Sequence, residues 1–284
     1  MTNGMLFLVL LSAHLVGDFY FQSAALAGKK EKEYSRVLLH SLIYAVFVFF
    51  VFLVIETPLL VLVAAAAAHW IIDSFKWLLR NQGWSKSMWF VVDQLLHLVS
   101  LFVITSLTPA VEIRPWLAGL PEDFWPWLTL ILLIVKPVNI SIDILFKRYA
   151  EAAKRQAEKV VPTQKEPLLA KEELSSAVQE EGGLTAQEVE GAGASVGTFE
   201  RIFAVIFAAL GQYAALGLLM AAKSMARYDR INKSPAFAEY YLIGTLYSIL
   251  FAIVAYLFVF EVILSGAATV DPLPVLILTP TPLP

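Results

Sequence analysis

Long apolar stretches separated by short polar ones run along most of this chain. A helix that crosses a membrane needs about 20 mostly apolar residues, and seven segments meet that requirement. We therefore expect transmembrane helices at residues 4–25, 37–55, 59–79, 88–107, 125–146, 201–222 and 237–264. The pattern predicts an all-α, polytopic helical membrane protein with about seven transmembrane helices, the first four or five of which form an N-terminal bundle.

The composition agrees with this pattern. Of the 284 residues, 58% are hydrophobic and only 16% are charged, and the mean hydropathy is +0.69, whereas soluble domains are about half apolar and a quarter charged. The net charge of −3 does not indicate a nucleic-acid partner, and the absence of cysteine excludes disulfides and thiolate metal sites. We expect an integral membrane protein surrounded by a lipid bilayer.

Composition also divides the chain into parts. Residues 147–197 are rich in Lys, Glu, Gln, Ala and Gly, which is typical of a soluble, flexible linker. This linker would separate a five-helix bundle at 1–146 from a two-helix hairpin at 198–264. Residues 265–284 form a Pro- and Thr-rich tail that is too short and too broken to span a membrane.

Basic residues predict the orientation of the helices. Lys and Arg gather after the first, third and fifth predicted helices, at Lys29, Lys30, Lys32, Arg36, Lys76, Arg80, Lys86, Lys147, Arg148, Lys154 and Arg155. By the positive-inside rule this side is cytoplasmic, which places the protein in the cell (inner) membrane and the linker in the cytoplasm. Strict alternation puts another basic loop, residues 223–233, outside. Either one segment does not span, or these cations have another use.

All four histidines lie inside predicted transmembrane helices. Three of them are four residues from an aspartate, in the pairs His14 and Asp18, His69 and Asp73, and Asp93 and His97; the fourth is His40. A spacing of four places two side chains on one face of a helix. Ionisable groups are costly to bury in a membrane and usually mark a functional site.

The depth of these seven residues predicts that they cluster. Counted from the basic loops at about 1.5 Å per residue, they all fall within roughly 6–20 Å of one rim. Imidazoles and carboxylates suit zinc, manganese or iron, as two metals or as one metal with histidines oriented by carboxylates. Asp18, Asp73 and Asp93 are candidates for a catalytic general base. Two other readings stay open: Asp–His hydrogen bonds that join helices, and a metal-free proton or solute path.

Further polar residues are candidates for supporting roles. We expect Gln22, Tyr44, Lys76 and Gln94 to surround the cluster. Lys76 could pair with Asp73 or bind an anion, but a rim lysine more often extends to the lipid headgroups. Farther along the chain, Lys223 and Arg227 share a helix face, where Glu239 could pair with either; the alternative is an anion site for a lipid headgroup or substrate.

The motifs around the histidines resemble those of domain of unknown function 3307, an uncharacterised bacterial membrane protein family. The matching segments are His14-Leu-Val-Gly-Asp-Phe-Tyr-Phe-Gln22, Leu38-Leu-His-Ser-Leu-Ile-Tyr44, His69-Trp-Ile-Ile-Asp-Ser-Phe-Lys76 and Asp93-Gln-Leu-Leu-His97. Residues 222–227 and 239–245 resemble the C-terminal part of longer members. The resemblance implies kinship and no activity. A looser likeness, to membrane-embedded metal-dependent hydrolases with His-rich helices, is an analogy.

These observations favour a membrane-embedded metal-dependent hydrolase near the cytoplasmic leaflet. A metal would lower the pKa of a bound water, and the substrate would be lipid-like or a membrane-tethered phosphate or amide, with Lys223 and Arg227 as anion ligands. A metal-ion or proton transporter is the second hypothesis, although the apolar segments 47–54 and 98–104 count against a continuous path. A non-enzymatic scaffold whose linker recruits a protein partner is the third.

Overall fold

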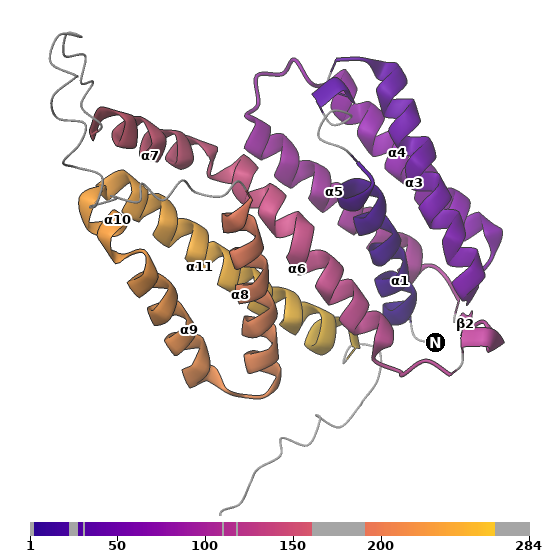
Figure 1. Ribbon diagram of the computed structural model, residues 1–284. Helices are drawn as coiled ribbons and strands as arrows, with labels where there is room; N and C mark the ends of the chain where they lie inside the picture. Colours follow the sequence, from indigo (N-terminus) through magenta and orange to yellow (C-terminus); the bar gives the residue numbers. More distant parts are fainter. Residues whose placement is uncertain are drawn as a thin grey trace, which may run out of the picture. The chain divides into compact units, whose positions relative to one another are not determined.

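The computed structural model describes residues 3–22, 28–30, 32–109, 111–117, 119–160 and 191–264. In these residues the chain is a helical, multi-pass membrane protein (Figure 1), with seven helices long and apolar enough to span a bilayer. The described residues contain two strands, each two residues long. The predicted fold class is therefore confirmed.

The first five predicted helices are present with ends close to those expected. They are α1 (Asn3–Leu15), which continues as a π-helical turn (Val16–Tyr20), α3 (Tyr34–Val54), α4 (Leu59–Leu78), α5 (Lys86–Ser106) and α6 (Phe124–Leu145). Local signals explain some of these ends. Pro58 precedes α4, and the Ser85 side chain accepts a hydrogen bond from the Met88 N–H at the start of α5. Residues 23–25, expected to continue the first helix, lie outside the described residues.

The described residues form two compact units, one of residues 1–144 and 250–284 and the other of residues 145–249. The helix α11 (Pro235–Leu257) contributes to both units and continues as a π-helical segment (Phe258–Leu264). Each unit is described by itself below.

In the first unit, α1 is the buried central helix. The side chains from Leu6 to Leu11 are all at most 3% exposed. Phe7 contacts the rings of Phe102 and Phe258, and Ser12 shares a 2.8 Å hydrogen bond with Thr129 of α6. By contrast, α3, α4 and α5 expose large apolar side chains, which include Leu42, Leu60 and Val99. Such a surface suits contact with lipid.

A short strand pair marks one end of this unit. The strand β1 (Ile55–Glu56), between α3 and α4, pairs antiparallel with β2 (Glu112–Ile113), between α5 and α6. Arg114 reinforces the pairing because its Nε donates to the Phe52 carbonyl at 2.7 Å. The α3–α4 turn and the α5–α6 loop therefore lie together at the same end, as alternating spans require.

In the second unit, the prediction of one helix over residues 201–222 is wrong. The chain forms α8 (Ala192–Ala209) and α9 (Tyr213–Ala226), joined by a tight turn and packed as a hairpin (Figure 1). Gly211 has φ +67° in this turn, a left-handed conformation that glycine adopts without steric cost. With 14 residues, α9 is about 21 Å long, which is short for a membrane core of about 30 Å.

The hairpin brings α9 back alongside α8. Lys223 pairs with Glu200, in the middle of α8. After α10 (Tyr228–Lys233), the Ser234 hydroxyl donates a 3.0 Å hydrogen bond to Gln156 Oε1 of α7 (Lys147–Val160). The segment 223–233 and α7 thus lie at the same end of this unit. The conflict among the basic loops arose from counting α8 and α9 as a single span.

Both ends of the predicted linker are helical. Its first residues form α7, and its last residues form the start of α8. Residues 161–190, the rest of the linker, and the tail 265–284 lie outside the described residues.

Candidate metal centre

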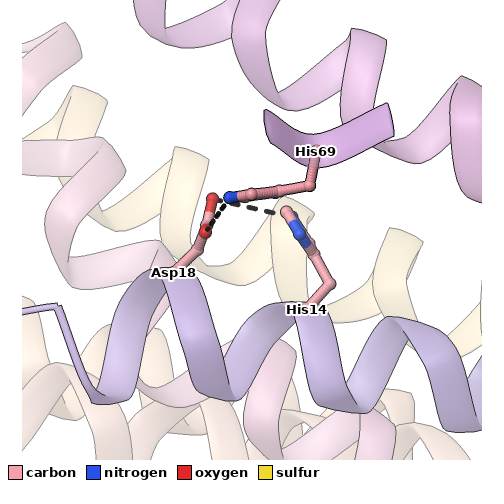
Figure 2. A group of neighbouring side chains, drawn as sticks. All are labelled: His14, Asp18 and His69. Atoms are coloured by element: carbon pink, nitrogen blue, oxygen red, sulfur yellow. Dashed lines mark ion pairs between the residues drawn. The ribbon is translucent and has the colours of Figure 1, made fainter. Parts of the chain in front are cut away.

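All seven predicted site residues come together in the first unit. They are His14 and Asp18 of α1 and its π-helical turn, His40 of α3, His69 and Asp73 of α4, and Asp93 and His97 of α5. The four histidines and Asp73 are at most 1% exposed, and the Asp18 side chain is 7% exposed. Figure 2 shows three members, with His69 and His14 directed toward the Asp18 carboxylate. Four consecutive helices thus contribute to one buried polar cluster.

Four atoms form the centre of this cluster. Asp18 Oδ1 lies 3.1 Å from His40 Nε2 and 3.4 Å from His69 Nε2. Asp73 Oδ2 lies 3.5 Å from His40 Nε2 and 3.4 Å from His69 Nε2. The two imidazole nitrogens are 3.2 Å apart. Each of the two carboxylate oxygens therefore lies within 3.5 Å of both ring nitrogens.

These separations fit the ligands of a tetrahedral metal ion. Nitrogen and oxygen atoms bound at about 2.0–2.2 Å to a tetrahedral zinc ion lie about 3.3–3.6 Å from one another. Three of the five separations, at 3.4–3.5 Å, fall within that spacing, and the other two, at 3.1 and 3.2 Å, are slightly shorter. A hydrogen-bond network is the competing description, and it requires a proton between the two close nitrogens. The donor set and the spacing both fit zinc, and the same donors suit manganese or iron.

One ring nitrogen of His97 makes a hydrogen bond, and the other has no partner among the described residues. Its Nδ1 lies 2.8 Å from the Asp93 carbonyl oxygen, so Nδ1 carries the proton and donates it to the carbonyl. The Nε2 atom then presents a lone pair. It is buried and has no hydrogen-bond partner among the described residues. Metal-binding histidines commonly show this arrangement, in which the second nitrogen is held by a backbone carbonyl.

The cluster offers more ligands than one ion needs. Besides the central four atoms, ligand atoms of Asp73, Asp93 and His97 lie within 4.8 Å of one another, as do those of His14, Asp18 and His69. Asp73 belongs to the central set and to the first of these groups, so it could bridge two positions. The sequence predicted these residues as ligands, and that role stays a prediction.

Two lysines enter the cluster, and one of them was missed by the sequence analysis. Lys30 Nζ lies 2.5 Å from Asp73 Oδ2, with its side chain 13% exposed. Lys76 Nζ lies 2.8 Å from Asp93 Oδ2. The expected pairing of Lys76 with Asp73, or its extension to the headgroups, is wrong because Lys30 holds Asp73 and Lys76 turns toward α5. Lys30 lies in the described helical segment 28–30, which is too short for a periodicity that could have pointed to it.

Of the uncharged residues expected around the cluster, Tyr44 packs directly against one of the central ligands. Its ring lies parallel to the His69 imidazole, with centroids 3.5 Å apart and an interplanar angle of 5°. Gln94 Nε2 donates to Asp93 Oδ2 at 3.4 Å. Gln22 is half-buried and, among the described residues, makes no hydrogen bond to the cluster. The aromatic ring, rather than the amides, is therefore the main support of the central ligands.

The predicted second polar cluster has different partners from those expected. Lys223 pairs with Glu200, a buried residue of α8, so the expected pairing with Glu239 is wrong. Next to Glu200, the guanidinium of Arg201 is 1% exposed and donates to the hydroxyls of Ser248 and Thr198, each at 3.0 Å. Because a carboxylate balances Lys223, this lysine is a weaker anion ligand than the sequence indicated. Arg227 ends α9, and an anion-binding role for it stays a prediction.

Comparison with known families agrees with the motifs. Residues 6–118 match a family described as protein of unknown function (DUF3307), so the resemblance is confirmed over these residues. The match covers every residue of the buried cluster, including Lys30 and Lys76. It ends before residues 222–245, whose likeness to longer members stays a prediction. Neither a curated protein nor a solved structure matches the chain.

Proposed function

We propose that the first unit binds a divalent transition metal, with zinc as the best fit, and uses it for hydrolysis of a lipid-like or membrane-tethered substrate. The four central ligands are Asp18, His40, His69 and Asp73. The observation that carries the proposal is the set of five separations of 3.1–3.5 Å between their ligand atoms. When bound, such a metal lowers the pKa of a coordinated water to near 7 and supplies a hydroxide nucleophile.

The position of Lys30 supports a catalytic rather than a purely structural centre. Catalytic zinc sites keep three protein ligands and one position for water, whereas structural sites use four protein ligands. Asp73 Oδ2 faces the central nitrogens and also contacts Lys30 Nζ. Lys30 can therefore retain Asp73 while the other three ligands stay in place. Asp18, His40 and His69 would then hold the metal, and Asp73, retained by Lys30, would serve as the general base for the water that the metal activates.

The apolar side of the bundle favours an enzyme over a transporter. Toward the end of the unit that carries β1 and β2, the interior is filled by buried apolar residues of several helices: Leu6, Leu8 and Leu10 of α1, Val48 and Val51 of α3, and Leu62 of α4. An ion would have to leave all its ligands to pass this layer, at a high energetic cost. The charged contacts of the polar cluster, with Lys30 and Lys76, lie instead at the other end.

For the location, we propose the cell (inner) membrane with the lysine-bearing end in the cytoplasm. The positive-inside rule supports this orientation, because the basic segments after α1, α4 and α6 fall on one side in a chain of alternating spans. The α8–α9 hairpin returns the fourth basic segment to the side of α7. The centre would then act near the cytoplasmic leaflet.

Metal content of the purified protein tests the proposal. Protein reconstituted with zinc and dialysed in detergent is expected to retain zinc, whereas His69→Ala should lose at least nine-tenths of it. Thr105→Val is the matched control, because Thr105 is 2% exposed in the same bundle and bonds only the Phe102 carbonyl of its own helix. Wild-type protein that retains no zinc, manganese or iron would overturn the proposal.

Activity and transport need separate assays. Metal-loaded protein in vesicles of mixed phospholipids is expected to release phosphate or fatty acid, and His69→Ala should not. Zinc flux into sealed proteoliposomes is expected to be absent. Flux that depends on His69, without any hydrolysis product, would replace the hydrolase with a transporter while leaving the metal site intact.

A further inference from the structure

The buried cluster contains a second group of metal-ligand side chains beside the four central atoms. Ligand atoms of Asp73, Asp93 and His97 lie within 4.8 Å of one another. Centres with two metals commonly place the ions about 3.5–4 Å apart, and a carboxylate shared between the two sets would be Asp73. The side chains alone would therefore permit two ions.

A lysine ammonium lies in this second group. Lys76 Nζ is 2.8 Å from Asp93 Oδ2, whereas Asp93 Oδ1 and His97 Nε2 are buried without a hydrogen-bond partner in the part of the chain that the structure describes. The unused carboxylate oxygen and ring nitrogen are ligands of the kind that transition metals prefer. The ammonium supplies the positive charge that Asp93 needs.

We infer that Lys76 takes the place of a second divalent cation, so that the centre holds a single metal ion next to a lysine. This inference rests on the proposed metal-binding function and adds the number of ions and the residue that sets it. Lys76 is a positioning residue, because it acts through Asp93 and not on a reacting atom. The second group is then a potential metal site that the ammonium keeps closed.

The charge of the cluster supports one ion. Asp18, Asp73 and Asp93 contribute three negative charges, and the ammonium groups of Lys30 and Lys76 contribute two positive ones. With neutral imidazoles, the cluster therefore carries −1 without a metal and +1 with one divalent ion. A second ion would raise this to +3 inside a buried, low-dielectric region, where uncompensated charge is costly. Loss of the Lys76 charge removes one of these positive charges and leaves Asp93 without its counter-ion.

The inference is tested by the number of ions bound per chain. Wild-type protein dialysed against zinc is expected to hold one ion, and Lys76→Met, which keeps the chain length but not the charge, is expected to hold two. Lys76→Arg, which keeps the charge, should hold one. With manganese, the electron paramagnetic resonance spectrum of Lys76→Met should show two exchange-coupled ions, since Asp73 would bridge them.

A further variant assigns the second ion and guards against a folding defect. Adding Asp93→Asn to Lys76→Met should return the number of bound ions per chain to one. If Lys76→Met does not fold, Lys76→Gln replaces it in the same measurement. One ion in wild type and still one in folded Lys76→Met or Lys76→Gln would overturn the inference and leave the proposed function standing. Two ions in wild type would also overturn it. No ion in any form would overturn the metal site itself.

Discussion

The ring of Tyr44 lies flat against the imidazole of His69, with centroids 3.5 Å apart and planes within 5° of parallel. Tyr44 is 1% exposed, so the two rings hold each other in a single orientation. This contact fixes the direction in which His69 Nε2 points, toward His40 and the two central carboxylates. Side chains that orient a ligand in this way commonly matter to metal affinity almost as much as the ligands.

Replacing Tyr44 should therefore weaken metal binding without removing a ligand. Tyr44→Leu is expected to lower the zinc affinity by about tenfold or more, measured by competition with a chelating dye. Tyr44→Phe keeps the ring and should bind zinc within about twofold of wild type. Equal losses in both variants would mean that the hydroxyl, and not the stacked ring, supports the site.

Gly17 makes this packing possible because α1 approaches α3 closely there. A Cβ at Gly17 would lie 3.0 Å from Tyr44 Cδ2 and 3.5 Å from Tyr44 Cα. Gly17→Ala should lower the free energy of unfolding by about 1–3 kcal/mol and also reduce zinc affinity. Gly217→Ala in α9 is the control, since a Cβ there meets nothing within 4 Å. Thermal unfolding in detergent measures the stability of both variants. An unchanged midpoint for Gly17→Ala would contradict the close approach of α1 and α3.

The Glu200–Lys223 pair joins α8 to α9, with side chains 8% and 20% exposed. Removal of one member of a buried ion pair leaves an uncompensated charge and typically costs about 3–5 kcal/mol, whereas apolar replacement of both costs far less. We expect Glu200→Leu and Lys223→Met each to destabilise the protein strongly, and the double variant to recover most of the loss. A double variant that is as unstable as the sum of the single ones would show that the pair is not coupled.

The hairpin makes a prediction about sidedness that the cysteine-free chain allows to be tested directly. Single cysteines at Gln82 and Asn232, which are exposed, should react with an impermeant maleimide from the same side of the membrane, the cytoplasmic side. A cysteine at the exposed residue Glu112 of β2 should react from the opposite side. If the cysteine of Asn232→Cys reacted from the same side of the membrane as that of Glu112→Cys, α8 and α9 would cross the membrane as one span.

Sequence reasoning succeeded where a property depends on one helix at a time. Apolar length located the spans, and the spacing of four between His69 and Asp73 placed both on one face of α4. Convergence of the cluster followed because His40 and the Asp–His pairs lie at similar depths in consecutive helices, and a buried ionisable group needs a partner.

Other features depended on contacts between segments that no periodicity encodes. Lys30 reaches Asp73 from the short helical segment 28–30, and the placement of so short a segment is set by the fold around it. The break between α8 and α9 fell inside an apolar run. Gly211 was the signal that could have revealed it, because glycine readily takes the positive φ that a tight turn needs. The β1–β2 pairing, two residues long in each strand, is too short to predict from the sequence.

X-ray absorption at the zinc edge of the reconstituted protein tests the central claim most directly. The geometry of Asp18, His40, His69 and Asp73 predicts a first shell of about four nitrogen and oxygen atoms at about 2.0–2.1 Å, with outer-shell scattering from two imidazoles. In His40→Ala and His69→Ala the imidazole scattering should fall or the bound zinc should be lost, whereas Thr105→Val should match wild type. A spectrum without imidazole scattering, or one that both histidine variants leave unchanged, would contradict a metal ion held between these helices.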